Sequence, residues 1–385
     1  MKKVCMIGLG EMGKRHAKDL EEFSNSLIRI AGVVEPSDKK FEIGCKWMGR
    51  VPDRFDFIKA MLDKTDPDGV VIATPNYLHL ECLRELAGRG IPLILEKPLD
   101  TGLEKVREIA AFSKQYKAPI MVHHVMRYSP IVLKAKELLD SGAIGKICGF
   151  NMVQFMNGSP MFQNFRRTFK TGGGQLLEKA THDFDILLFL TGCKPKSVFS
   201  ICKRQYFGGN RPNGLRCSNC NENKSCRHNI VQKSHDIISG NNLCVFADEI
   251  DIFDNESCLI ELDNGMFGTY SQCFFSRAPF SRRYEFNGST GFISIDFSMG
   301  KILLKNLKLK RREECFDFDY HGRIHYNGAP GVAKHFLKLM NDTTACVHSP
   351  VNEAVDAELI SFAAYKSNET KRVVNIADLN KVSTS

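Results

Sequence analysis

The sequence predicts an α/β protein of two domains. The first is an N-terminal doubly wound parallel sheet of the Rossmann type, and the second is a C-terminal α/β domain with a large, mostly antiparallel open sheet. Three observations support this: 385 residues are too many for one compact core; apolar strands alternate with helical segments as far as about residue 123; and strands with few helices between them follow residue 144. We therefore expect domains over residues 1–123 and 124–385.

The first fourteen residues predict a strand, a glycine turn and a helix. Lys3–Ile7 is a short apolar strand, and glycines follow it at the G-x-G-x-x-G spacing, where a helical pattern begins. Such glycines permit a tight turn and close approach of a pyrophosphate to the helix N-terminus, although an ordinary structural turn is the alternative. The flanking strand and helix favour a dinucleotide phosphate site made by Gly8, Gly10, Glu11, Met12 and Gly13.

The second predicted strand, 27–34, leads directly to Glu35. An acid at this point accepts hydrogen bonds from the ribose hydroxyls of NAD and repels the 2′-phosphate of NADP. Ser37 and the two lysines that follow it are the counter-argument, because they offer groups that bind a phosphate. Repulsion by a carboxylate held by Pro36 should outweigh attraction to mobile lysines, so the sequence favours NAD over NADP.

The remaining strands of the first domain, 69–74, 91–95 and 120–123, all end in polar residues. Ligands of a parallel sheet bind at the carboxyl ends of its strands. The residues at these ends are Thr74, Pro75 and Asn76; Glu96 and Lys97; and His123 and His124. The first five are candidate cofactor residues. Helices are expected between the strands, over 78–86 and 103–112.

The second domain should begin with a helix over 131–139. Strands are then expected at 146–155, 197–206, 257–262, 267–275, 283–286, 291–295 and 301–305. One helix should cover 176–190, and two more should close the domain at 332–340 and 351–366. Glu178 and His182, four residues apart, would share a face of the first of these helices, with Asp185 on roughly the same side.

Composition excludes several classes of protein. The net charge of +9 is spread along the chain, which favours a solvated basic surface over a nucleic-acid site. No apolar run approaches the ~20 residues of a membrane helix, and Gly8, Gly10 and Glu11 interrupt the apolar start, which argues against a signal peptide. We expect a cytoplasmic protein without membrane or nucleic-acid partners. Fourteen cysteines in such a chain indicate free thiols or a metal site.

The order of five motifs resembles that of the Gfo/Idh/MocA family of nicotinamide-dependent sugar and polyol oxidoreductases. They are GLGEMGKRH near the start, ATPNYLH at 73–79, EKPL at 96–99, RYSP at 127–130 and GGGQLLEKATHDFDILLFLTG at 172–192. The resemblance implies that the open sheet of the second domain covers the substrate site and mediates homodimer or homotetramer contacts. It also implies that Lys97 is the catalytic lysine, Glu178 the substrate-orienting acid and His182 the catalytic histidine.

Further site residues follow from the same resemblance. His79 and Glu96 join the cofactor-binding set, and a sugar or polyol substrate would be contacted by Arg127, Tyr128, Arg166 or Arg167, Lys179 and His182. Two departures weaken the comparison. Glu178 stands where aspartate is common and is followed by Lys179, which is either a substrate contact or a solvent-facing partner of Asp183. The segment 324–331 lacks the family's glycine-rich stretch ending in an acid.

A polar segment of the second domain, about 208–244, contains a possible metal site. Cys217, Cys220 and Cys226 have C-x₂-C-x₅-C spacing, so their thiolates can converge on one ion, and Zn²⁺ needs a fourth ligand. Cys244 resembles the fourth cysteine of one branch of the family, and His228 is the local alternative. A structural zinc, an iron–sulfur centre and reduced thiols all stay open.

The predicted function is hydride transfer between a secondary alcohol of a sugar, inositol or sugar derivative and NAD. Such a reaction needs a hydride acceptor and a base for the hydroxyl proton, which Lys97 or His182 would supply. Two alternatives use the same residues differently. One is an NAD-retaining glycosidase that oxidises its sugar transiently and eliminates the aglycone, and the other is a non-catalytic dinucleotide-binding regulator.

Overall fold

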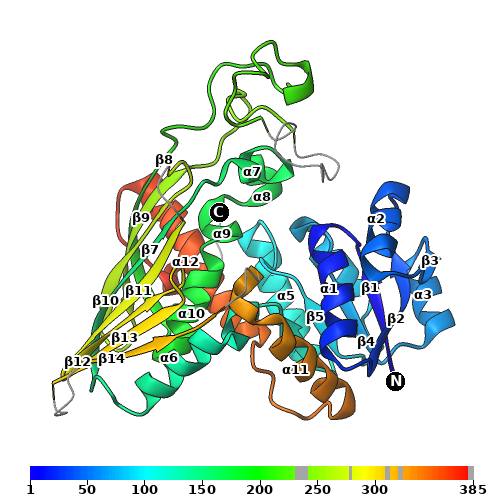
Figure 1. The fold of residues 1–385 in the computed structure, drawn as a ribbon, viewed down its shortest axis with the longest axis horizontal. Helices are drawn as coiled ribbons and strands as arrows, with labels where there is room; N and C mark the ends of the chain where they lie inside the picture. Colours follow the sequence, from blue (N-terminus) through cyan, green and yellow to red (C-terminus); the bar gives the residue numbers. More distant parts are fainter. Residues whose placement is uncertain (230–241, 277–279, 308–312, 320–323, 380–385) are drawn as a thin grey trace. The chain divides into compact units, whose positions relative to one another are not determined.

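The structure, a computed structural model, describes residues 1–229, 242–276, 280–307, 313–319 and 324–379 (Figure 1). The chain divides into two compact units, and each is described by itself. Unit 1 comprises Met1–Leu133 and Tyr320–Asp356, and unit 2 comprises Lys134–Asp319 and Ala357–Ser385. This division differs from the predicted domains 1–123 and 124–385, because unit 1 also takes in a segment from near the C-terminal end of the sequence.

Unit 1 is built on a parallel sheet of six strands in the order β3-β2-β1-β4-β5-β6. This is the Rossmann order, with a switch point between β1 and β4. The sheet confirms the predicted fold class, and all its strands except β3 lie where the sequence places them. The sequence does not predict β3, because its three residues are mostly exposed and lack an apolar pattern. The strands are Lys2–Ile7 (β1), Ile28–Val34 (β2), Asp53–Phe55 (β3), Gly69–Ile72 (β4), Leu93–Leu95 (β5) and Ile120–Val122 (β6).

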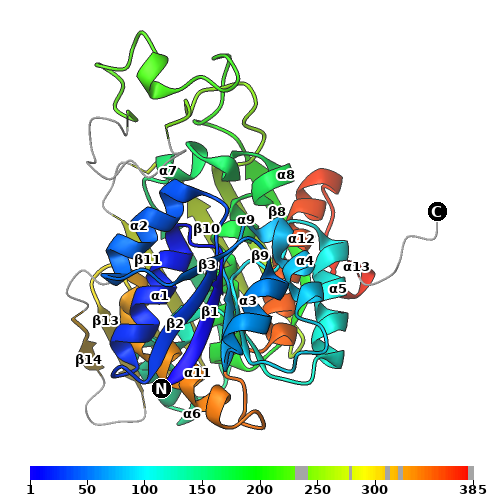
Figure 2. The ribbon, with the colours of Figure 1, turned by 90° about the vertical axis from the view of Figure 1, so that its right-hand side faces the viewer.

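Helices cover both faces of this sheet, as a doubly wound fold requires. Helix α1 packs against α2 and α11, and on the other side α3 packs against α4 and α4 against α5 (Figure 2). Their bounds are Glu11–Phe23 (α1), Asp38–Met48 (α2), Ile58–Thr65 (α3), His79–Glu85 (α4), Leu103–Gln115 (α5) and Ala329–Asn341 (α11). Short 3₁₀ helices lie at Asn76–Leu78 (η1), Val125–Tyr128 (η2) and Ile324–Asn327 (η6).

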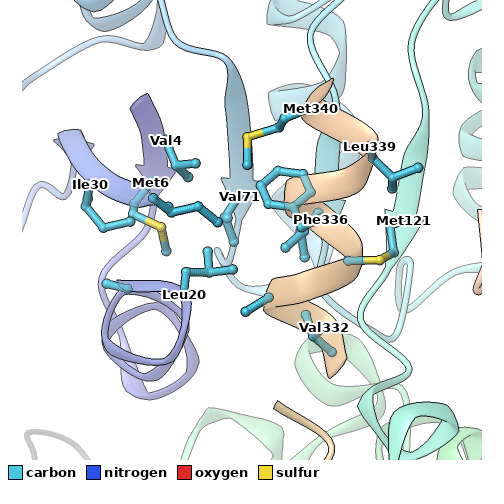
Figure 3. Packing of buried hydrophobic residues seen from close by; sticks show 14 of the residues in the cluster. Val4, Met6, Leu20, Ile30, Val71, Met121, Val332, Phe336, Leu339 and Met340 are labelled. Carbon is cyan, nitrogen blue, oxygen red and sulfur yellow. The ribbon is translucent and has the colours of Figure 1, made fainter. Parts of the chain in front are cut away.

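The core of unit 1 explains why a distant segment belongs to it. Val4 and Met6 point from β1 to the face that α1 covers, as the two-residue period of a strand requires (Figure 3). Phe336 and Leu339 of α11 are fully buried in the same cluster. Each such side chain contributes about 1.5–3 kcal/mol when it leaves water, so removing α11 would expose a large apolar surface.

Unit 2 is built on a sheet of nine strands in the order β14-β13-β12-β11-β7-β10-β9-β8-β15. Every pairing is antiparallel except that of β10 with β7, so the predicted antiparallel character is confirmed. The strands are Ile147–Phe155 (β7), Pro195–Lys203 (β8), Asn255–Leu262 (β9), Phe267–Cys273 (β10), Ser281–Gly288 (β11), Gly291–Asp296 (β12), Lys301–Asn306 (β13), Glu313–Asp317 (β14) and Val374–Asn375 (β15). The sequence does not predict the edge strands β14 and β15, because one is mostly exposed and the other has two residues.

One face of the nine-stranded sheet is covered and the other is open. Ser200 of β8 donates its hydroxyl to Ala364 of α12, and Phe184 of α10 stacks edge-on against Tyr270 of β10. The opposite face exposes apolar side chains, among them Ile201 and Phe267. The helices of this part of the chain are Pro130–Asp140 (α6), Ser159–Phe162 (α7), Phe169–Gly172 (α8), Gln175–Glu178 (α9), Thr181–Thr191 (α10), Val351–Thr370 (α12) and Ile376–Leu379 (α13), with 3₁₀ helices Phe165–Arg167 (η3) and Cys217–Asn219 (η4).

The single helix predicted over 176–190 is wrong, because the structure has two, α9 and α10. The amide of Ala180 donates to the carbonyl of Gln175, five residues back, and the amide of His182 donates to Lys179, three residues back. This change of hydrogen-bond spacing ends one helix and begins the next. Glu178 and His182 therefore do not share a face of one continuous helix. Among the described residues, no helix is both long and apolar enough to cross a membrane.

Candidate functional site

The glycine turn of unit 1 has the geometry that a dinucleotide needs. A Cβ on Gly13 would lie 2.2 Å from the carbonyl oxygen of Gly8, so the strand and the helix meet at van der Waals distance. Gly8 itself has φ +90°. At Gly10, in contrast, a Cβ would meet nothing within 4 Å. The turn therefore needs two glycines for its own packing, whereas the third leaves open space in front of the first N–H groups of α1.

Glu35 lies beside this turn, at the end of β2. Its carboxylate is 4% exposed and accepts hydrogen bonds from the amides of Leu9 and Ser37, both at 2.9 Å. The first of these bonds ties the carboxylate to the glycine turn. Ser37 is occupied as the N-cap of α2, where its hydroxyl accepts from the amide of Lys40. Ser37 and the two lysines that follow it therefore belong to the start of α2. They are not part of a loop that folds over the Glu35 carboxylate.

The turn after β4 is fixed by His79. This side chain is fully buried, with Nδ1 at 3.0 Å from the carbonyl oxygen of Leu99 and Nε2 at 3.3 Å from that of Thr74. Burial lowers the pKa of His79, and its hydrogen bonds to the backbone oppose the shift. His79 thus joins the segments that follow β4 and β5 through contacts to their backbone. Asn76, 5% exposed, begins the 3₁₀ helix between them.

Glu96 and Lys97 follow β5, and the Lys97–Pro98 peptide bond is cis. Glu96 is buried, and its Oε1 lies 2.5 Å from Nε2 of His16 and 3.0 Å from Nδ1 of His123. Burial raises the pKa of Glu96, but the charges and hydrogen bonds of His123 and His16 outweigh that effect and hold it well below its usual range. Burial and the charge of His16 lower the pKa of His123. The predicted cofactor residue Glu96 is therefore part of a compact cluster with two histidines.

Sequence reasoning missed His16 as a member of this cluster. The residue lies on α1, three residues beyond Gly13, where a helical period places it on the face toward the sheet. Its sequence signal is its place as the last residue of the GLGEMGKRH motif, in an otherwise strongly charged helix. The sequence indicates His123 only as a polar residue after a strand. In the structure its Nδ1 contacts the carboxylate of Glu96.

Arg127 was predicted to contact substrate, and the structure places it in the interior of unit 1. The side chain is 1% exposed and donates to the carbonyl oxygen of His348, 2.8 Å away, and to the carboxylate of Glu353. Tyr128 donates its hydroxyl to the sulfur of Met121 and lies against the rings of His335 and His348. Both residues thus connect η2 to the C-terminal segment of unit 1.

In unit 2 the structure brings together two of the predicted residues. Arg166 and Glu178 form an ion pair, with Nε 2.7 Å from Oε1, and Glu178 is 4% exposed. Arg167 instead donates to the carbonyl oxygen of Cys244, 2.6 Å away. Arg166 is therefore the arginine that accompanies the predicted substrate-orienting acid. His182 is buried at the start of α10.

Asp183 is not at the surface, which removes the alternative in which it pairs with Lys179 in solvent. It is fully buried, and its carboxylate accepts from Tyr270 at 2.9 Å, from Nε of Arg282 at 2.7 Å and from Tyr284. These partners come from β10 and β11. The network anchors the first turn of α10, and with it His182, to the sheet.

A second buried acid, Glu256 of β9, lies in the same sheet. It is 1% exposed, and its carboxyl oxygen accepts a hydrogen bond from the side-chain amide (Nε2) of Gln272. Burial raises the pKa of Glu256 to about 8, against the hydrogen bonds from Gln272 and Tyr365. Sequence reasoning did not single it out, because an acid in an alternating strand is normally on the exposed face.

The cysteine segment of unit 2 folds so that its first and last cysteines lie on paired backbone. The amide of Cys217 donates to the carbonyl of Asn242 and that of Cys244 to Leu215, each at 2.7 Å. The amide of Phe246 donates to the sulfur of Cys244, and burial together with the charges of Cys220 and Cys226 raises the pKa of the Cys244 thiol. Nε2 of His228 lies 3.0 Å from the hydroxyl of Tyr206.

These contacts favour Cys244 over His228 as the fourth ligand of the predicted zinc site. In the described part of the chain, however, no three of the cysteine sulfurs lie within 4.8 Å of one another. Residues 230–241 of the segment lie outside the described residues. All fourteen cysteines are free of disulfide bonds. The zinc site stays a prediction.

Family models match both parts of the chain. Residues 2–124 match the oxidoreductase family with an NAD-binding Rossmann fold, and residues 132–294 match the GFO/IDH/MocA C-terminal domain. The chain belongs to the Gfo/Idh/MocA family. The resemblance seen in the five motifs is thereby confirmed, and unit 1 of this Gfo/Idh/MocA protein carries the NAD-binding domain of an oxidoreductase family.

Curated relatives share about a quarter of the aligned residues with this family member. It is 27% identical over 208 residues to the rhizopine catabolism protein MocA of Rhizobium meliloti, covering 54% of this chain and 62% of that protein. Identity to inositol 2-dehydrogenase of the same organism is 29% over 193 residues, or 50% and 56% of the two chains. The 2,7-anhydro-N-acetylneuraminate hydratase of Mediterraneibacter gnavus is 26% identical over 200 residues, 50% of each chain. The aligned parts thus span about half to three fifths of these relatives.

Solved structures share the fold over nearly the whole chain. A levoglucosan dehydrogenase in complex with NADH and levoglucosan has a TM-score of 0.79 and 19% identity, covering 97% of this chain and 99% of that one. GenD2 from gentamicin A biosynthesis, in complex with NAD, has a TM-score of 0.73 and 17% identity, with 97% and 96% covered. At these identities the comparison shows that the fold is shared.

Proposed function

We propose that this protein is an NAD-dependent dehydrogenase acting on a secondary alcohol of a sugar, inositol or sugar derivative. The observation that carries the proposal is the open space at Gly10, between the buried carboxylate of Glu35 and the start of α1, at the switch point of the Rossmann sheet. Such a glycine lets a pyrophosphate approach the helix N-terminus closely, and Glu35 has lone pairs left for the ribose hydroxyls. The names of its inositol and levoglucosan dehydrogenase relatives support the choice of substrate class.

Bound NAD would supply the hydride acceptor, and residues of this chain would handle the proton. Lys97 follows β5, whose neighbours β4 and β6 end in the polar turns described above. We assign the hydroxyl proton of the substrate to Lys97 or His182, and the orientation of a neighbouring hydroxyl to Glu178. The ion pair with Arg166 orients the Glu178 carboxylate, whose oxygens can accept hydrogen bonds from substrate hydroxyl groups.

Several finer assignments belong to the same proposal. Glu35 makes NAD the preferred dinucleotide over NADP. Cys217, Cys220, Cys226 and Cys244 hold a structural zinc, and the open face of the nine-stranded sheet forms the contacts of a homodimer or homotetramer in the cytoplasm. The exposed Ile201, Leu259 and Phe267 on that face support the oligomer, because a monomer rarely leaves several large apolar side chains in water on one sheet.

A second candidate is an enzyme that oxidises its sugar only transiently and returns the hydride after elimination. The relative named a 2,7-anhydro-N-acetylneuraminate hydratase favours it, because that name describes no net oxidation. The two candidates differ in one measurable property. A dehydrogenase accumulates NADH with its product, whereas the eliminating enzyme releases an aglycone while its NAD stays bound and unchanged in amount.

The test is a panel of polyols, sugars and glycosides, in which turnover is followed by NADH absorbance and by product release.

The role of Lys97 is tested by substitution. Lys97→Ala should lower kcat by about 10²-fold or more with NAD binding retained, because general acid–base catalysis contributes 10²–10⁴. Lys59→Ala, at an exposed lysine of the same unit, is the matched control and should leave kcat unchanged. An unchanged kcat in Lys97→Ala would remove that residue from the mechanism. Absence of any turnover across the panel would favour a non-catalytic dinucleotide-binding regulator.

A further inference from the structure

Three potential metal ligands of unit 1 come from separate elements and meet in its interior. His16 lies on α1, Glu96 follows β5 and His123 follows β6. One nitrogen of each imidazole and one oxygen of the carboxylate all lie within 4.8 Å of one another. The two rings are 4.1 Å apart between centroids and inclined by 76°, so their nitrogens approach the same carboxylate oxygen from different directions.

The ligand types and their spacing suit a transition metal. Two imidazoles and one glutamate are the protein ligands of one class of zinc site, at about 2.0–2.2 Å from the ion. Ligand atoms at that radius in tetrahedral geometry are about 3.3 Å apart. The observed separations from Oε1 of Glu96 are 2.5 Å to His16 and 3.0 Å to His123. An ion would therefore need the side chains to move apart by less than about 1 Å.

A cavity of about 240 Å³ gives access to the cluster. It lies entirely within unit 1, and both His16 and His123 are among the residues that line it. Asp19, one turn along α1 from His16, also lines it and interacts electrostatically with that histidine. The cavity has room for water molecules, which would complete the coordination of an ion held by three protein ligands.

The charges around the cluster partly offset one another. Glu96 and Asp19 each contribute a carboxyl group, that of Asp19 at the cavity wall. Against these, the positive charge of Lys97 acts on His123, and Arg15 and Lys18 also line the cavity. A cation at the cluster would thus be held by directed bonds to nitrogen and oxygen more than by a general negative field. That requirement favours zinc, cobalt or nickel over magnesium or calcium, which need oxygen ligands.

We propose that His16, Glu96 and His123 form a binding site for a divalent transition-metal ion of the zinc class, open to the cavity between α1 and the segment 325–330. The ion would join the ends of β5 and β6 to α1, next to Lys97. This site is separate from the thiolate site proposed in unit 2, because it contains no sulfur. The proposal does not depend on the proposed dehydrogenase function, since it concerns metal binding to the protein without substrate.

The test is a calorimetric titration of the full-length, NAD-free protein with Zn²⁺, made on the wild type, His123→Gln and Cys217→Ser. His123→Gln should weaken binding at one site by at least about tenfold, because even changes around metal ligands cost 10–100-fold. Cys217→Ser should leave that site unchanged. His335→Gln is the matched control, since this histidine of α11 lies in the same unit, half-buried, outside the cluster.

Cobalt gives an independent measurement that needs no variant of the cluster. In the Cys217→Ser protein, Co²⁺ should give a ligand-field spectrum without thiolate-to-metal charge transfer, and X-ray absorption should show nitrogen and oxygen neighbours only. Failure of His123→Gln to fold would leave this measurement decisive. Equal stoichiometry and affinity in the wild type and a folded His123→Gln would overturn the proposal. So would cobalt bound through sulfur alone, with none retained in Cys217→Ser.

Discussion

Replacing Glu256 by glutamine should make unit 2 more stable at neutral pH and remove part of its pH dependence. Burial raises the pKa of this carboxyl from its ordinary value of 4.5 to about 8. The folded chain therefore keeps the proton up to about pH 8, whereas the unfolded chain releases it near pH 4.5. The contribution of the Glu256 carboxyl to the free energy of unfolding is therefore fully present below pH 4.5, and it is lost as the pH rises through 8.

The expected magnitude follows from that window. Each unit of pH costs about 1.36 kcal/mol, and pH 7 is roughly 2.5 units above the ordinary pKa, so ionisation of the unfolded chain lowers the free energy of unfolding by about 3 kcal/mol. Glutamine has the shape of the protonated acid and cannot ionise. Glu256→Gln should therefore differ little from the wild type near pH 5 and exceed its stability by about 3 kcal/mol at pH 7.

Urea denaturation between pH 5 and 9 provides the measurement. Trp47, the single tryptophan of the chain, lies in unit 1, so its fluorescence reports that unit, whereas circular dichroism includes unit 2. Glu261→Gln on the same strand is the control: hydrogen bonds from Lys196 and Ser197 lower the pKa of this half-buried carboxyl, so its loss should change the profile between pH 5 and 9 little. Parallel pH profiles for the wild type and Glu256→Gln, or a less stable glutamine variant at pH 7, would refute the reasoning.

Three further predictions concern the nucleotide and metal sites. Gly10→Ala should fold with wild-type stability and lose NAD affinity, because its added Cβ meets no protein atom. Gly13→Ala should lower the melting temperature, because its added Cβ meets the backbone of Gly8. Thermal unfolding with and without NAD distinguishes the two variants. The wild type should favour NAD over NADP by at least about tenfold in kcat/KM, or ~1.4 kcal/mol, and Glu35→Gln should narrow that ratio; an equal wild-type preference contradicts it. Cys217→Ser should lose about one zinc per chain by elemental analysis, and equal zinc content in both proteins would exclude the thiolate site.

The parts of the site that sequence could predict are those fixed by short-range geometry. The G-x-G-x-x-G turn and the acid after β2 need particular residue types at fixed spacings, so the pattern reveals them. The positions of most strands could also be predicted, because a buried strand needs a short run of apolar residues. Both predictions involve contacts between neighbours along the chain or between strands in a standard order.

The parts that could not be predicted depend on contacts between distant segments. Arg127 looked like a substrate contact, but its partner Glu353 is 226 residues away and holds it in the interior. One of two alternatives for Lys179 placed Asp183 beside it in solvent, but Asp183 is buried with three partners from β10 and β11. The break between α9 and α10 has no glycine or proline to mark it. A polar side chain whose hydrogen-bond partners come from distant segments has the same local sequence as one exposed to water. The sequence near Arg127 or Asp183 therefore could not distinguish the two situations.

The discontinuous make-up of unit 1 has a consequence for the order in which the protein can be made. Phe336 and Leu339 complete the core of the nucleotide-binding sheet, yet they are translated some two hundred residues after its last strand, β6. During synthesis one apolar face of the six-stranded sheet therefore stays incompletely covered while the strands of unit 2 leave the ribosome. A fragment ending near residue 123 should be prone to aggregation for the same reason. A shortened protein for nucleotide-binding studies should instead join residues 320–356 to the N-terminal segment through a linker.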